Sequence, residues 1–149
     1  MPPTKLHSVS RLRQRRVDEL RKEYAELLDQ LHEEEARGDA MQALLDQTLQ
    51  AVARQMHDAI TPRELEAYYR FVAYQSTELQ GHRSALDQLR AVCEEKRTIL
   101  VQAKQDERVI VELERAHHAR ERRASDKREQ HAADEFLTRR AVMKAPSDD

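Results

Sequence analysis

The segment 60–64, Ile-Thr-Pro-Arg-Glu, constrains the fold most, because it holds the one stop-and-restart signal in a sequence of otherwise helical character. Thr61 can cap a new helix with its hydroxyl, Pro62 suits the first helical position, and Glu64 completes a capping box. Pro62 also disfavours helical geometry at Thr61, so the preceding helix should end near residues 59–60. The sequence therefore predicts two helices of unequal length that fold back on each other.

The composition is typical of long helices. Charged residues make up 36%, hydrophobic residues 39% and aromatic residues 4%, with two glycines and no tryptophan. A compact globule would carry more turn residues and a fuller aromatic core. A seam between two helices also leaves no room for a sizeable catalytic cavity. We expect an all-α fold, a single long two-helix antiparallel coiled-coil hairpin, with helices over residues 4–59 and 62–143, a turn at 60–62 and a frayed tail at 144–149.

Heptad periodicity predicts the side chains of the seam. The a and d positions of the first helix include Val17, Leu20, Tyr24, Leu27, Leu31, Met41, Leu45, Val52 and Ala59. Those of the second helix include Leu65, Tyr68, Val72, Leu79, Leu86, Leu89, Cys93, Leu100, Ala103 and Ile110. Polar residues at Gln75, His82 and Lys96 interrupt the second helix. They either make the seam adaptable to exchanging partners or fix its register, and both interpretations stay open.

The second helix is longer than the first, so its end should protrude. At about 1.5 Å per residue, folding about Thr61 places the start of the first helix beside roughly residue 117. Alanines are the only apolar residues in 114–135, so the hydrophobic seam ends where its partner helix ends. The stretch beyond is predicted to be a solvated helix with Phe136 among the apolar side chains near its tip.

Basic residues gather where this hairpin should open. One cluster is at the start of the first helix and one lies beyond the seam of the second: Arg11, Arg13, Arg15 and Arg16, and Arg120, Arg122 and Arg123. The formal net charge of −2 is too balanced to indicate a nucleic-acid or membrane partner by itself. Each cluster alone is ordinary solvated helix surface, but two at one end favour a docking surface for an acidic partner.

Four of the six aromatic residues follow the turn closely: Tyr68, Tyr69, Phe71 and Tyr74. Of these four residues, only Tyr68 occupies an a or d position of the seam. The other rings either close over the hairpin core beside the turn or anchor a partner. The sequence leaves both interpretations open.

The sequence lacks recognisable motifs for catalysis or cofactor binding. The sequence contains no phosphate-binding glycine loop and no nucleophile elbow. Glu114 and His117 match one half of a di-iron motif, but no second Glu-x-x-His is present, so we expect no metal, no cofactor and no enzymatic activity. Cys93, the single cysteine, falls on the seam, which indicates a packing role over a redox role. A single cysteine also fits a reducing compartment, where disulfides are rare. No signal peptide or bilayer-spanning segment is evident in the sequence, so we expect a cytoplasmic protein.

Two non-enzymatic alternatives stay open for this sequence. Basic residues before heptads are the pattern of a basic-zipper nucleic-acid-binding protein, although the reversal at Thr61 and the polar d positions argue against it. A structural coiled-coil spacer is the other alternative, and the oligomeric state of the isolated protein would distinguish it.

Five segments of the chain follow one another in a distinctive order: a basic opening at 12–16, Leu-Glu-x-Tyr-Tyr-x-Phe-Val at 65–72, His82-Arg83, Asp-Glu-Phe at 134–136 and Ala-x-Met-Lys at 141–144. In the order and spacing of these motifs the chain resembles the flagellar export protein family FliJ. It covers nearly the whole chain. The YscO-type virulence secretion proteins share the architecture, and the Asp-Glu-Phe segment favours the flagellar family.

The resemblance implies a non-enzymatic stalk of the type III export apparatus, similar in shape to the stalk of rotary ATPases. Its helix termini would enter the pore of the hexameric export ATPase, its second helix would contact the membrane export gate, and it would help escort export chaperones. It implies no nucleic-acid partner, no membrane insertion, a monomer when isolated and a peripheral place at the cytoplasmic face of the inner membrane. The expected ATPase contacts are Arg11, Arg13, Arg15, Arg16, Arg120, Arg122, Arg123 and Phe136, and the expected gate contacts are Phe71, Tyr74 and His82.

Overall fold

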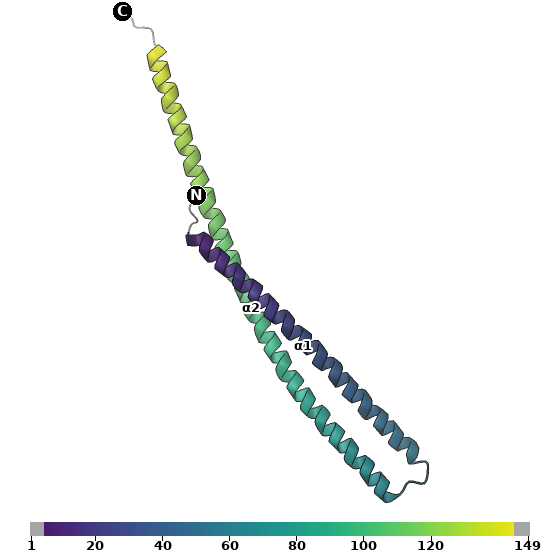
Figure 1. Ribbon diagram of the computed structural model, residues 1–149. Helices are drawn as coiled ribbons and strands as arrows, with labels where there is room; N and C mark the ends of the chain where they lie inside the picture. The colour runs from purple at the N-terminus through teal and green to yellow at the C-terminus, as the bar shows by residue number, and fades with distance from the viewer. Residues whose placement is uncertain (1–4, 145–149) are drawn as a thin grey trace, which may run out of the picture. The chain divides into compact units, whose positions relative to one another are not determined.

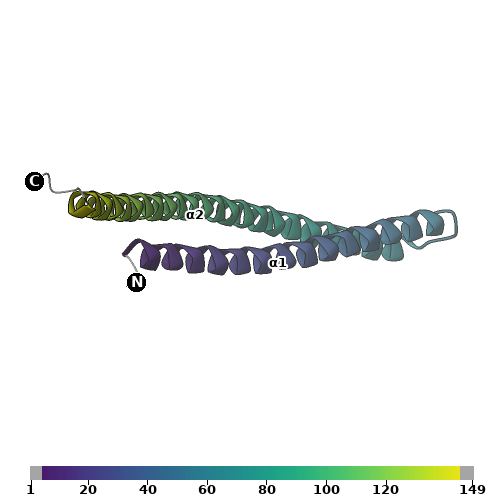
Figure 2. The ribbon, with the colours of Figure 1, turned by 90° about the horizontal axis from the view of Figure 1, so that it is seen from above.

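A computed structural model describes residues 5–144, and this part of the chain forms two helices with no strand. Helix α1 spans Lys5–Gln55 and helix α2 spans Pro62–Lys144, with residues 56–61 between them. Figures 1 and 2 show that α1 and α2 run antiparallel on either side of this connection. The prediction of an all-α helical hairpin is confirmed.

The chain divides into two compact units. Unit 1 combines Met1–Arg15 with Ala103–Asp149, of which residues 5–15 and 103–144 are described, and unit 2 is Arg16–Gln102. Within unit 2, α1 and α2 pack along a shared seam next to their connection. Within unit 1, the first turns of α1 pack on α2, which then continues alone.

Helix α1 ends earlier than predicted, at Gln55 and not near Ala59. The N–H groups of His57 and Asp58 bond to carbonyls three residues back, at 3.3 and 3.0 Å. This tighter turn ends the α-helix, and Ala59 lies exposed in the connection, outside the seam. Pro62 restricts the backbone conformation of Thr61 alone. It therefore does not predict how many residues the connection between the two helices contains.

Helix α2 begins at Pro62, as predicted. The N–H of Glu64 donates to the Thr61 hydroxyl at 3.3 Å, and the N–H of Leu65 donates to the Thr61 carbonyl at 3.1 Å. These bonds satisfy donors that the start of a helix otherwise leaves free, and Pro62 has none to satisfy. The cap sets the residue at which the second helix starts.

The seam of unit 2 consists of the predicted apolar positions. The side chains below one tenth exposed are Val17, Leu20, Leu45 and Val52 of α1 and Leu79, Leu86, Cys93 and Leu100 of α2. All of them occupy a or d positions, and those of α2 recur every seven residues. Removing these apolar side chains from water is the main force that holds the two helices together.

Two of the polar residues in the seam, His82 and Lys96, have specific partners on α1. The Nε2 atom of His82 lies 2.8 Å from the backbone oxygen of Glu34, and its Nδ1 lies 3.7 Å from the Glu34 carboxylate. The Lys96 ammonium pairs with Glu23. The hydrogen bond from Lys96 and its charge hold the pKa of Glu23 below its ordinary value. These contacts support the interpretation that polar seam residues fix the register.

The two glycines should respond differently to substitution. A Cβ at Gly38 would meet Cδ2 and Nε2 of His82 at 3.1 Å, whereas a Cβ at Gly81 would meet nothing within 4 Å. Because glycine in a helix interior costs about 0.5–1 kcal/mol relative to alanine, we expect Gly81→Ala to raise the free energy of unfolding by about that amount. Gly38→Ala should give a smaller gain or a loss, because the new methyl group displaces the His82 ring. Urea unfolding followed by circular dichroism measures both, and equal gains would contradict a tightly held ring.

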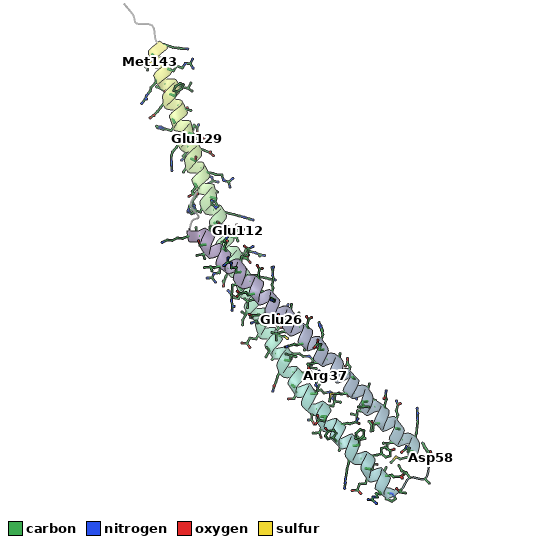
Figure 3. All side chains as sticks on the ribbon, in the orientation of Figure 1. Glu26, Arg37, Asp58, Glu112, Glu129 and Met143 are labelled. Atoms are coloured by element: carbon green, nitrogen blue, oxygen red, sulfur yellow. The ribbon has the colours of Figure 1, made fainter. Side chains whose placement is uncertain are left out.

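In unit 1, every described residue of α2 from 120 to 144 is exposed. Phe136 is 64% exposed and Met143 is 88% exposed. Figure 3 shows side chains projecting from a single ribbon around Glu129 and Met143. The solvated end of the second helix is therefore present as predicted. Lys144, assigned to the frayed tail, lies in α2, and residues 145–149 fall outside the described part of the chain.

Candidate partner-binding surfaces

In unit 1, polar contacts hold the start of α1 on α2. The Nδ1 atom of His7 lies 2.9 Å from a carboxylate oxygen of Glu114, and Arg13 lies 3.6 Å from Asp106. The hydrogen bond from His7 lowers the pKa of Glu114, and Ser10 and His118 act in the same direction against the opposing effect of burial. The start of the first helix thus lies near residue 114, in agreement with the predicted position.

The predicted ATPase contacts of unit 1 are exposed: Arg11, Arg13, Arg15, Arg120, Arg122, Arg123 and Phe136. Arg120 lines a hollow of about 450 Å³ whose other walls include Leu6, Leu113 and His117. This hollow places one arginine of the second basic cluster beside the first turn of α1. Arg16 is the first residue of unit 2, and its guanidinium lies 3.9 Å from Glu19.

Unit 2 carries an apolar groove between α1 and α2. Its volume is about 290 Å³, and it is lined by Met41 and Leu44 of α1 and by Phe71, Tyr74, Gln75 and Glu78 of α2. Phe71 is 48% exposed, Tyr74 64% and Leu44 51%. The Oε1 atom of Gln75 is buried and has no hydrogen-bond partner in the described structure. The groove therefore combines exposed rings with one unsatisfied acceptor.

Sequence reasoning found the two aromatic walls of this groove and missed the α1 side. Leu44 stands beside the heptad frame next to Leu45, which is a weak signal by itself. Only the register between α1 and α2 shows that Met41 and Leu44 come to lie at the level of Phe71.

His82 is not part of this groove. Its side chain is 12% exposed, and its ring is turned into the seam towards Gly38 and the Glu34 carbonyl. Of the three predicted gate contacts, the structure brings Phe71 and Tyr74 together in the groove and directs His82 to the inside of the hairpin.

A family model described as flagellar FliJ protein matches residues 3–145. The chain belongs to the FliJ family. It is accordingly a component of the flagellar protein export apparatus, in which the FliJ family is non-catalytic. No curated protein and no solved structure gives a significant match. The match to the flagellar family agrees with the resemblance that the sequence motifs indicate and favours it over the YscO-type alternative.

The described residues of this FliJ-family chain show neither a metal-binding cluster nor a membrane-spanning segment. No group of histidine, cysteine, aspartate and glutamate side chains within residues 5–144 is arranged to hold a metal ion. Neither helix, as far as it is described, contains a stretch long and apolar enough to cross a membrane. The apolar positions of α1 that a basic zipper would offer to a second chain pack instead on α2 of the same chain.

Proposed function

We propose that this FliJ-family chain is a non-enzymatic coiled-coil stalk of the flagellar export apparatus. It binds the hexameric export ATPase through unit 1, binds the membrane export gate through the groove of unit 2 and helps escort export chaperones. It is a monomer when isolated and reaches the cytoplasmic face of the inner membrane through these partners. The observation that carries the proposal is that the arginines of unit 1 and the rings of Phe71 and Tyr74 in unit 2 are exposed on a helical hairpin of this family.

The ATPase surface is supported by the charge of unit 1. Arg11 and Arg15 are exposed near the start of α1, and Arg120, Arg122 and Arg123 are exposed beyond it on α2. Arginine guanidinium groups form paired, charge-assisted hydrogen bonds with carboxylates, so they suit an acidic lining. Phe136 on the solvated end of α2 adds an apolar anchor.

Reversing the charge of Arg11 and Arg15 should weaken the ATPase complex. We expect the double variant Arg11→Glu, Arg15→Glu to lower affinity for the purified export ATPase by about tenfold or more, since two attractive contacts become repulsive. Binding of the unaltered protein should also decline with added salt, because exposed charges are screened over about 8–10 Å near physiological ionic strength. Pull-down and titration with the ATPase at several salt concentrations measure both effects.

Arg54→Glu, Arg63→Glu is the matched control. Both residues are exposed in unit 2, and the variant changes the net charge by the same amount. Equal losses in the two double variants would attribute the effect to total charge and contradict a specific surface in unit 1.

The gate surface is supported by the groove. The exposed rings at its wall can insert into a partner. A buried hydrogen-bond acceptor without a donor costs about 1–3 kcal/mol of folding free energy, and an N–H or O–H group of a partner would recover it. The free Oε1 of Gln75 is such an acceptor. A docked gate segment would therefore cover Phe71 and Tyr74 and satisfy Gln75.

A further inference from the structure

The two flanks of the seam in unit 2 differ in chemistry. On one flank polar pairs bridge the helices: Arg83 donates to Oε1 of Gln42 at 2.6 Å, and Arg90 lies 3.4 Å from a Glu35 oxygen. These pairs cover the edge of the seam on that side. A partner that docked there would have to break them.

The opposite flank carries exposed apolar side chains. Val92 is 48% exposed and Ile99 is 42% exposed, and Ala85 stands one heptad before Val92. Each precedes a buried seam residue of α2 by one position, so the three share one face of the helix. They extend over about 21 Å, or about four helical turns. Glu78 separates them from Phe71, so this surface is distinct from the groove.

Acidic residues edge this apolar stripe at Val92 and Ile99, while Arg37, two heptads after Glu23 on the same face of α1, pairs with Glu34 at 3.2 Å. The ion pair between Glu23 and Lys96 shows that α1 reaches α2 on this flank. Glu26 lies one turn after Glu23, and Glu95 lies three residues after Val92 and four before Ile99, so these carboxylates flank the stripe. Glu33 follows Glu26 by one heptad. Glu26, Glu33 and Glu95 form no ion pair with any described residue.

We propose that the face formed by Ala85, Val92 and Ile99 binds an amphipathic helix of a partner protein, with basic residues on both sides of that helix's apolar stripe. The partner would lie along the hairpin as a third helix. Its apolar residues would cover Val92 and Ile99, and its lysines or arginines would pair with Glu26, Glu33 and Glu95.

Charge decides between such a partner and a second copy of this chain. Two copies packed through this face would bring their acidic edges together, and like charges across an interface are unfavourable. A basic helix meets the same edges with opposite charge. The face formed by Ala85, Val92 and Ile99 is separate from the proposed ATPase and gate contacts, and a partner helix could bind it without either of them.

The test uses the full chain and two synthetic helical peptides of equal length, each with a leucine stripe, one flanked by lysines and the other by glutamates. We expect the lysine peptide to bind, and the glutamate peptide to bind at least about tenfold more weakly, in fluorescence anisotropy titrations. Ile99→Gln should weaken binding of the lysine peptide by about tenfold, because it removes one of the two large apolar side chains of the face. Glu26→Gln, Glu33→Gln should weaken it as well.

Matched controls make the result specific. Val101 is 45% exposed, two residues after Ile99 and on a different face of α2, so Val101→Gln should leave binding unchanged. Glu129→Gln on the solvated end of α2 should do the same. Equal losses in the Ile99 and Val101 variants, or equal binding of the two peptides, would overturn the proposal. Analytical ultracentrifugation tests for self-association. If the protein self-associates and Ile99→Gln abolishes this, the face binds a second copy of the chain, and the proposal of a basic partner helix is overturned.

Discussion

Leu20→Ala is expected to lower the free energy of unfolding by about 2–5 kcal/mol, because it opens a cavity at one of the most buried positions of the seam. Leu20 is 1% exposed, as is Val17 one turn before it. Only eight residues of the described chain are below one tenth exposed, so each contributes a large share of the packing. Small proteins are stable by about 5–15 kcal/mol in total, so the loss should be evident as a large shift of the urea midpoint.

Leu49→Ala is the matched control for this experiment. Leu49 lies on the same helix but is 47% exposed, so its truncation should change the free energy of unfolding by no more than about 0.5 kcal/mol. Unfolding should be followed by circular dichroism at two protein concentrations, since a monomeric hairpin has a midpoint that does not depend on concentration. A midpoint of Leu20→Ala equal to that of the unaltered protein would contradict the seam.

Phe71→Ala and Tyr74→Ala should strongly impair binding to the export gate and protein export, with little change in melting. Both rings are about half exposed or more, so little packing is lost from the hairpin itself. A ring buried at the centre of an interface is worth about 2 kcal/mol or more, which corresponds to roughly a thirtyfold change in the dissociation constant. Binding to the purified cytoplasmic part of the gate and secretion in cells measure the two consequences.

Tyr69→Ala provides the comparison for these variants. Tyr69 is 55% exposed and belongs to the same aromatic cluster, but it does not line the groove. Its substitution should leave gate binding unchanged. A sharp drop in melting temperature of the Phe71 and Tyr74 variants, with gate binding per folded molecule preserved, would show that these rings belong to the core.

Features that depend on residues near one another in the chain could be predicted. The Thr61 cap and Pro62 define the start of the second helix through contacts made within four residues. Seven-residue spacing likewise identifies Leu79, Leu86 and Cys93 as seam residues, because helix geometry alone puts them on one face. The exposed arginines and the solvated end of α2 follow from the same pattern, since that end contains few apolar residues to bury.

Features that join the two helices were decided by the tertiary structure. The groove needs Leu44 beside Phe71, and the inward orientation of His82 needs the missing side chain of Gly38 and the carbonyl of Glu34. Each of these relations depends on the register of α1 against α2. The register depends on many contacts along the seam and on the number of residues in the turn. A local sequence pattern reports only on neighbouring residues, so it cannot predict this register.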